Sequence, residues 1–406
     1  MCSAGDWNCE RTHGAKIVDN YVASFPAVND ASVMAHFDAL RWEINLEKYS
    51  AAELDSNPVV QAVFVHEYVH YAQALTGTIG RHILIEMARL AVFVGILRRH
   101  GWPPPAGYDQ VNLREVLSAA SKADLAGTEP ERQFKDFLKQ LQFATSDKRA
   151  RMSKGTPPGT FVRHTLTVGP HSVDDFVHVT GDDAAGPCAI PITDRVVFEN
   201  MARQVQRNFL LFNNELKTAP VDDERQKPNR DLEYVCLHDL VGQRLPKSED
   251  NAKWTITLCQ IALLCRNPGS AFEHLVDRLS GLRTVDLTSF VQAANRDEWF
   301  KGEFNKPPIQ LVLNELVEKW GTAILPRENW ELREFTKLIA NACNALLGDY
   351  TLMASPLITW KDVGHWIARF GCPPIVLSEG PRHEIQGIKT SAPWISYFRR
   401  LADLLA

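Results

Sequence analysis

The chain lacks the features that would assign it to a specialised class of protein. Its 406 residues carry 44 Lys and Arg against 49 Asp and Glu, a formal net charge of −5, so it has no basic excess of the kind that binds nucleic acid. Its most hydrophobic run, residues 83–97, is shorter than the ~20 residues that span a bilayer and contains Glu86 and Arg89. It has no repeat and no low-complexity tract. We therefore expect a globular protein that binds neither nucleic acid nor membrane.

The sequence also lacks signs of export or of a disulfide framework. Its 8 cysteines form no Cys-x-x-Cys pair, and several lie in apolar runs such as residues 261–265, which is typical of buried free thiols. Residues 1–7 have neither the basic head nor the apolar centre of a signal peptide. These two observations predict a cytoplasmic protein, and they leave its oligomeric state open.

Length and hydrophobic patterning indicate the fold class. The chain is 45% hydrophobic and 23% charged and is long enough for one large or two ordinary domains. Alternating residues on both sides of Gly169 and Pro170 predict a β-hairpin across residues 160–179, whereas the pattern from Leu232 onward is mostly helical. We expect an α+β fold that is predominantly α-helical. Residues 1–215 would form the region with the functional site, and residues 216–406 a helical region that packs on it and completes the same unit.

One stretch of the sequence contains a motif typical of zinc peptidases. Residues 63–72, Val-Phe-Val-His-Glu-Tyr-Val-His-Tyr-Ala, contain the pentad His-Glu-x-x-His, which a random chain of this composition would show about 0.03 times. In a helix, His66 and His70 lie on one face and can bind one metal ion, with Glu67 beside them. A helix from residue 58 to about Leu75 is expected here. A core helix with two surface histidines is the alternative, and it leaves Glu67 unexplained.

A catalytic zinc ion takes three protein ligands and keeps one position open, so the pentad needs a partner. The metzincin pattern requires Gly at 73 and His at 76, and this chain has Gln73 and Thr76 there. Two glutamates remain as the third ligand. Glu86 lies on the expected next helix, residues 82–99, and Glu199 lies on a helix expected to follow Thr193 and to run to about residue 213.

Each of these glutamates also has an ordinary explanation. Arg89 follows Glu86 by three residues, and Arg203 follows Glu199 by four. Residues at these spacings are neighbours on a helix surface, so either glutamate could form a simple ion pair. The residues alone leave the choice of third ligand open.

The pentad and its surroundings resemble a known family. Residues 66–73, with Thr-Gly-Thr-Ile-Gly at 76–80 behind them, are similar to gluzincin-type zinc metallopeptidases, in particular to uncharacterised bacterial members with a His-Glu-Tyr-x-His-x-x-Gln signature. Their third ligand is a Glu in a later helix of the form apolar-x-Glu-x-x-Ala, which residues 197–202 match and residues 84–89 match less well. The resemblance covers these two motif segments. It favours Glu199 and implies a zincin-like core with a small sheet and a helical C-terminal half.

The resemblance implies a role for each residue of the site. Zn²⁺ would be held by His66, His70 and Glu199, with Glu67 as the general base that hydrolyses peptide bonds of a protein or peptide substrate. Gln73 is a candidate for fixing a histidine tautomer. By residue type alone, the candidates for stabilising the oxyanion are Tyr234, His238 and His171.

Three other functions use similar residues. A peptide deformylase needs a cysteine ligand in a Gly-Cys-Leu-Ser context upstream of the pentad, and this chain has none. A ferritin-like di-iron protein needs a second Glu-x-x-His, for which only residues 10–13 qualify. The third rival is a metal-binding interaction protein or a pseudoprotease without catalysis. A purely structural site needs no base, so the intact Glu67 favours catalysis.

Overall fold

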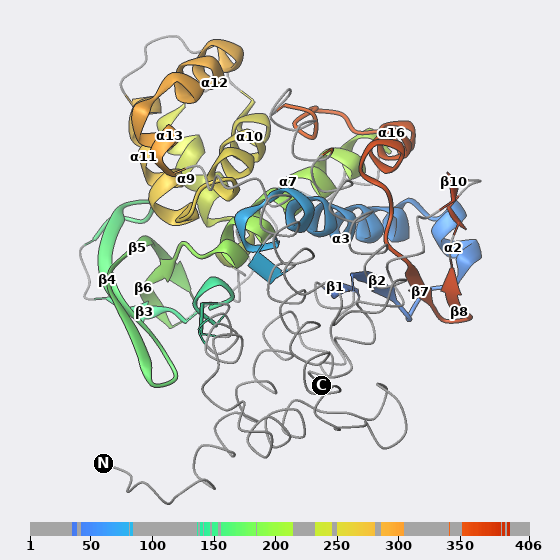
Figure 1. The fold of residues 1–406 in the computed structure, drawn as a ribbon, viewed down its shortest axis with the longest axis horizontal. Coiled ribbons are helices and arrows are strands. Elements are labelled where there is room, and N and C mark those ends of the chain that lie inside the picture. Colours follow the sequence, from blue (N-terminus) through green and yellow to red (C-terminus); the bar gives the residue numbers. More distant parts are fainter. Residues whose placement is uncertain are drawn as a thin grey trace, which may run out of the picture.

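The structure is a computed structural model, and it describes residues 35–38, 42–80, 82–83, 136, 139–140, 142–146, 148–152, 156–183, 185–213, 232–245, 250–280, 286–303, 341, 351–382, 384–385 and 388–389. In this part of the chain helices predominate over small sheets, which confirms the α+β class in general terms (Figure 1). Most of the helix expected at residues 82–99 lies outside the described residues, and so does Glu86.

The central helix, α3, spans Pro58–Thr76, within a residue of the prediction. The side chain of Asn57 accepts a hydrogen bond from the amide of Val59 at 2.9 Å, and Pro58 occupies the first turn, where its missing N–H costs nothing. From Phe64 to Thr76 every residue of α3 is buried. The helix ends at Gly77, where an added Cβ would lie 2.7 Å from the Gln73 carbonyl oxygen. A short helix, α2 (Ala51–Ser56), precedes α3.

The second long helix, α7, spans Asp194–Phe212 and packs along α3 (Figure 1). It begins after Thr193, as predicted, but the Thr193 hydroxyl donates to the Ser146 carbonyl at 2.9 Å and does not cap the helix. Its buried side chains recur at helical spacing and join the main core; they include Val197, Met201, Val205 and Phe209. Two helices from distant parts of the sequence therefore form the centre of the molecule.

A small sheet with the order β1–β2–β7–β8 joins the two ends of the described chain. Its strands are β1 (His36–Asp38), β2 (Glu43–Leu46), β7 (Ile375–Leu377) and β8 (Gly380–Arg382). β2 and β7 are parallel, with Ile44 opposite Ile375. None of these strands was predicted, because runs of three or four residues carry too little alternation to stand out from the surrounding sequence.

Two tyrosines tie α3 to the segment before β7. The Tyr68 hydroxyl donates to the Gly371 carbonyl at 2.8 Å, and the Tyr71 hydroxyl donates to the Phe370 carbonyl at 2.9 Å. Both side chains are fully buried. Residues beyond 370 therefore take part in fixing the central helix.

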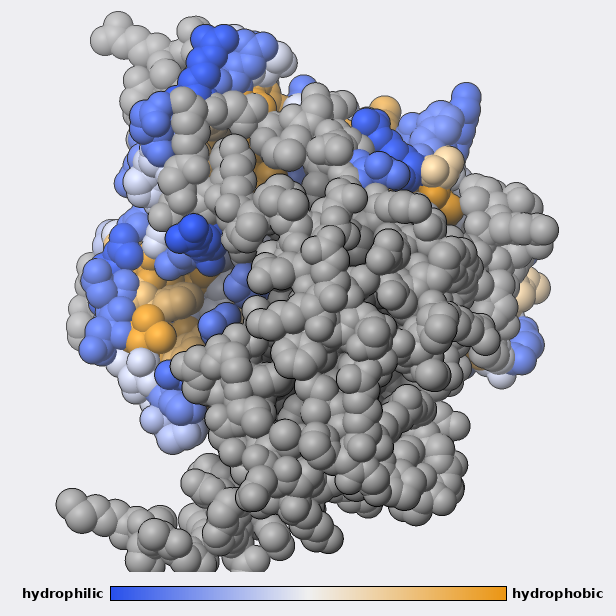
Figure 2. Space-filling model, in the orientation of Figure 1, coloured by the Kyte–Doolittle hydropathy of each residue, from blue (hydrophilic) through white to orange (hydrophobic). Residues whose placement is uncertain are grey.

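The second sheet has the order β3–β6–β5–β4 and contains the predicted hairpin. Its strands are β3 (Ala150–Arg151), β4 (Phe161–Val168), β5 (His171–Asp183) and β6 (Gly186–Pro191). β4 and β5 are antiparallel and turn at Gly169, which has a φ of 57°, so the hairpin is confirmed. Figure 2 shows apolar side chains gathered over β5 and β6, with hydrophilic side chains around them. β6 was not predicted, and it leads directly into α7.

The remaining elements are mostly short helices. They are the 3₁₀ turn η2 (Leu232–Tyr234), α9 (Cys236–Arg244), α10 (Asn251–Leu263), α11 (Pro268–Ser280), α12 (Leu287–Arg296), α13 (Glu298–Glu303) and α16 (Trp360–Phe370), with the paired strands β9 (Glu384–Ile385) and β10 (Ile388–Lys389). These helices agree with the mostly helical pattern expected from residue 232 onward, and α10 packs on α7. The helical prediction from residue 232 onward missed the four C-terminal strands.

The prediction of buried free thiols is confirmed for the cysteines that the structure describes. The described cysteines are all free and buried: Cys188, Cys236, Cys259, Cys265 and Cys372. Among the helices of the described chain, none combines the length and the apolar character needed to cross a membrane.

Candidate metal centre

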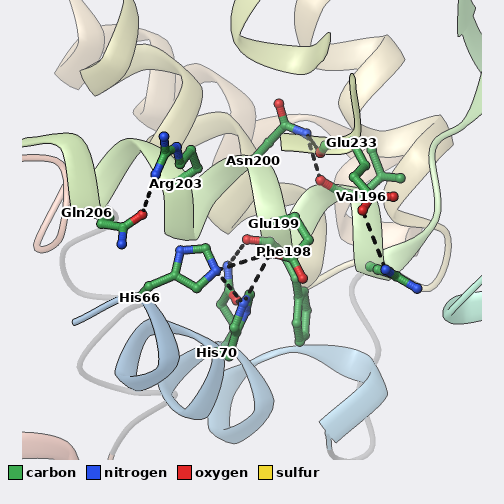
Figure 3. Close-up of polar contacts among 11 residues, drawn as sticks. His66, His70, Val196, Phe198, Glu199, Asn200, Arg203, Gln206 and Glu233 are labelled. Atoms are coloured by element: carbon green, nitrogen blue, oxygen red, sulfur yellow. Dashed lines mark hydrogen bonds and ion pairs between the residues drawn. The ribbon is translucent and has the colours of Figure 1, made fainter. Parts of the chain in front are cut away.

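The structure brings His66, His70 and Glu199 together between α3 and α7. Figure 3 shows the two imidazoles on α3 facing the carboxylate of α7. Nε2 of His66 lies 3.2 Å from Glu199 Oε2, Nε2 of His70 lies 3.4 Å from the same oxygen, and the two nitrogens are 3.1 Å apart. Among the described residues this is the one cluster of three or more His, Cys, Asp or Glu whose ligand atoms could hold a metal ion.

The three distances fit a tetrahedral metal ion. Zinc binds imidazole nitrogen and carboxylate oxygen at ~2.0–2.1 Å, so two ligand atoms at the tetrahedral angle lie about 3.3 Å apart. The observed separations of 3.1, 3.2 and 3.4 Å scatter around this value. The separations are compatible with one ligand atom from each residue at three corners of a zinc-sized tetrahedron, and among the described residues no further His, Cys, Asp or Glu joins the group.

Burial and charge make the cluster a strong electrostatic unit. The side chains of His66, His70 and Glu199 are 11%, 10% and 5% exposed. Burial lowers the pKa of His70, but the charge and hydrogen bond of Glu199, with Glu67 and Gln73, outweigh it and raise that pKa to about 9. Burial raises the pKa of Glu199, but the two histidines hold it well below its usual range. The carboxylate is thus ionised and needs a cation beside it, which a proton or a metal ion can supply.

Gln73 fixes the tautomer of His70. The Gln73 amide nitrogen donates to the carbonyl of Phe198 on α7 at 3.1 Å, which leaves its oxygen as the acceptor for His70 Nδ1 at 3.0 Å. In neutral His70, the form that binds a metal ion, the proton is therefore on Nδ1, and Nε2 presents a lone pair to the cluster. His66 differs, because its Nδ1 is buried and has no hydrogen-bond partner among the described atoms.

Glu67, the expected general base, lies beside the cluster and contributes no atom to it. Its residue is 7% exposed on α3. Its charge contributes to raising the pKa of His70 and, as the smallest of the causes, that of Tyr234. Glu67 is thus next to His66 in the helix and is not one of the three grouped ligand residues.

The three candidates for stabilising an oxyanion fall in different places. Tyr234, on η2, has its ring centroid 6.2 Å from that of His66. The charge of Glu199, followed by burial, raises the pKa of the Tyr234 hydroxyl, so the hydroxyl is protonated and can donate a hydrogen bond. His238 Nδ1 contacts Thr255 Oγ1 at 3.3 Å on α10, and His171 lies at the turn of the β4–β5 hairpin. Tyr234 therefore lies beside the cluster, with its ring near that of His66.

The surroundings of Glu199 differ from those of a surface carboxylate. Arg203, the arginine one turn further along α7, donates to Gln206 Oε1 at 2.7 Å (Figure 3). Phe198 stacks on His70, with ring centroids 6.1 Å apart and an interplanar angle of 20°.

One residue near the site could not be predicted from the sequence. Asn200, the neighbour of Glu199, is fully buried, and nothing distinguishes it from an ordinary polar residue on the helix surface.

Comparisons of the chain with protein-family models, with curated proteins and with solved structures found no match. The resemblance of residues 66–80 to gluzincin-type peptidases stays a prediction. The case for a function therefore rests on the geometry of the cluster and on the chemistry of its residues.

Proposed function

We propose that the protein is a zinc-dependent metallopeptidase with a zincin-like core, in which His66, His70 and Glu199 hold the ion and Glu67 is the general base. The observation that supports the proposal most is the approach of Glu199 Oε2 to 3.2 and 3.4 Å from the two Nε2 atoms, across 133 residues of sequence. Ordinary packing of a protein core does not require three potential ligand atoms to converge on one point. An uncompensated buried carboxylate is costly, so the arrangement needs a cation.

Each residue has a defined task in this mechanism. When bound, a zinc ion supplies Lewis acidity, because it lowers the pKa of water toward ~7 and polarises a carbonyl group. Glu67 accepts the proton of the attacking water and passes it to the leaving amine. In this proposal the Tyr234 hydroxyl donates a hydrogen bond to the oxyanion that develops on the scissile carbonyl. Gln73 keeps the proton of His70 on Nδ1 throughout.

The low exposure of the three ligands is also compatible with a structural metal site, in an interaction protein or a pseudoprotease. Side chains that are 5–11% exposed leave little room for a substrate around them. The need for Glu67 distinguishes a catalytic metal site from a structural one. A structural site does not need the carboxylate, whereas general-base catalysis by such a group contributes roughly 10²–10⁴-fold to the rate.

The test compares Glu67→Gln, Glu199→Ala and the wild type for zinc content and for cleavage of labelled casein and a library of internally quenched peptides. Glu43→Gln is the matched control, because Glu43 is a buried glutamate, 5% exposed, on β2 and outside the cluster. We expect Glu67→Gln to keep one zinc and lose at least 100-fold in rate, and Glu199→Ala to lose zinc. Full activity in Glu67→Gln would contradict the mechanism, and normal zinc binding in Glu199→Ala would contradict the third ligand.

A further inference from the structure

Both the amide nitrogen and the amide oxygen of the Asn200 side chain form hydrogen bonds. It is fully buried on α7, immediately after Glu199, and in Figure 3 it points away from the histidines toward Glu233. Its amide nitrogen donates to the Val196 carbonyl at 2.9 Å and to the Glu233 carbonyl. Its oxygen accepts from the backbone amide of Leu237 at 3.0 Å, with a longer contact of 3.4 Å from the next amide, at residue 238.

These bonds replace a helix cap. α9 begins at Cys236, and Val235 before it has no side-chain oxygen that could accept a bond from the first turn. The residues at 237 and 238 are the second and third of the helix, whose amides an N-cap side chain normally satisfies. Asn200 supplies that oxygen from a different helix. The start of α9 is therefore tied to α7 by a side chain next to the third metal ligand.

The same side chain also holds the residue before α9. The Glu233 carbonyl belongs to the peptide bond that links Glu233 to Tyr234, and Asn200 donates to it. Asn200 thus binds the backbone on both sides of Tyr234, at residue 233 and at residue 237. The ring between these two anchors lies 6.2 Å from His66.

We propose that Asn200 is a positioning residue that holds Tyr234 against the metal centre, so that one turn of α7 sets both the third ligand and the oxyanion donor. The role of Tyr234 in this proposal rests on the proposed peptidase function. The placement of Tyr234 by Asn200 does not, because it is a property of the fold. The two parts can be measured separately.

The first measurement does not need activity. The protein is labelled with 3-fluorotyrosine, and the ¹⁹F signal of Tyr234 is assigned by its loss in Tyr234→Phe. Asn208→Ala is the matched control for Asn200→Ala, since Asn208 is also a buried asparagine of α7 and donates to the Ser355 carbonyl at 2.8 Å. We expect zinc to shift the Tyr234 signal in the wild type and in Asn208→Ala. In Asn200→Ala we expect the shift to disappear while one zinc still binds.

The second measurement is a double-mutant cycle on the peptidase rate. If Asn200 acts through Tyr234, Asn200→Ala and Tyr234→Phe lower kcat by similar factors, about 10²–10³, and the double variant is no slower than Tyr234→Phe by more than about 2-fold. An unchanged zinc response of the Tyr234 signal in Asn200→Ala, or losses in kcat that multiply, would overturn the proposal. If the wild type cleaves nothing, the peptidase proposal fails and the ¹⁹F result still decides the role of Asn200.

A second variant covers the case in which Asn200→Ala does not fold. Adding Val235→Thr puts a hydroxyl immediately before α9, which can accept a bond from the first turn once residue 235 takes up the extended backbone of an N-cap in place of its ψ of −14°. The bond to the Glu233 carbonyl stays absent in this double variant. We expect it to fold and bind zinc without the Tyr234 shift, and a wild-type shift would refute the placement.

Discussion

Replacing Gln73 by leucine tests whether the residues around the metal ligands are tuned for metal binding. Gln73 is 2% exposed, so water cannot take over its hydrogen bonds. The change removes the acceptor of His70 Nδ1, at 3.0 Å, and the donor to the Phe198 carbonyl, at 3.1 Å. Two buried polar groups then lose a partner, each at roughly 1–3 kcal/mol, so we expect the zinc-free protein to lose about 2–6 kcal/mol of unfolding free energy.

Zinc affinity should fall in the same variant. Without Gln73 the proton of His70 is free to move to Nε2, the atom that must face the ion. Loss of such an outer hydrogen bond typically weakens metal binding 10–100-fold, equivalent to about 1.4–2.7 kcal/mol. Urea unfolding of the zinc-free protein gives the first quantity, and competition with a chromophoric chelator gives the second.

The chain offers a matched control at Gln260 on α10. Gln260 is 3% exposed, and neither its amide nitrogen nor its amide oxygen has a hydrogen-bond partner among the described atoms. Gln260→Leu removes a buried amide without breaking a bond, so we expect it to be neutral or stabilising and to leave zinc affinity unchanged. The reasoning is refuted if Gln73→Leu binds zinc like the wild type, or if Gln260→Leu loses as much stability as Gln73→Leu.

Two further predictions concern the scaffold. Tyr71→Phe deprives the Phe370 carbonyl of its 2.9 Å partner, so it should lower the unfolding free energy by roughly 1–2 kcal/mol, and an unchanged urea midpoint would contradict this. The hydrogen bond from Arg151 is the main cause that lowers the pKa of Asp183 from 3.8 to about 2. A lowered carboxyl pKa stabilises the fold above pH ~4 and stops doing so as the pH falls to about 2. The melting-temperature difference between wild type and Asp183→Asn should therefore shrink from pH 4 to pH 2; a constant difference is the contrary result.

The central helix could be located from sequence because its signals are local. Pro58 after Asn57 marks its start, Gly77 marks its end, and the pentad lies between them. Its periodicity carries no information, since every residue from Phe64 to Thr76 is buried and no polar face alternates with an apolar one. The hairpin at Gly169 was found for the same reason, because its turn and its two strands are contiguous.

What the sequence left hidden depends on contacts between distant segments. β2 and β7 are short, and their pairing joins residues 44 and 375, so no local pattern signals it. Tyr234 could be named by residue type only, because its distance from His66 depends on how η2 sits on α7. No sequence pattern pointed to Asn200, because its hydrogen-bond partners are backbone groups whose positions cannot be read from the sequence.

The parallel pair β2–β7 also affects the order in which parts of the fold can form during synthesis. Residue 44 leaves the ribosome long before residue 375, and at roughly 5–20 residues per second the interval is on the order of tens of seconds. During that time the proposed ligands, the base and Tyr234 have all been made, but β2 has no β7 beside it and α3 lacks the acceptors at residues 370 and 371. The nascent chain therefore carries every residue of its proposed metal centre before it has the strand and the carbonyl groups that hold the central helix.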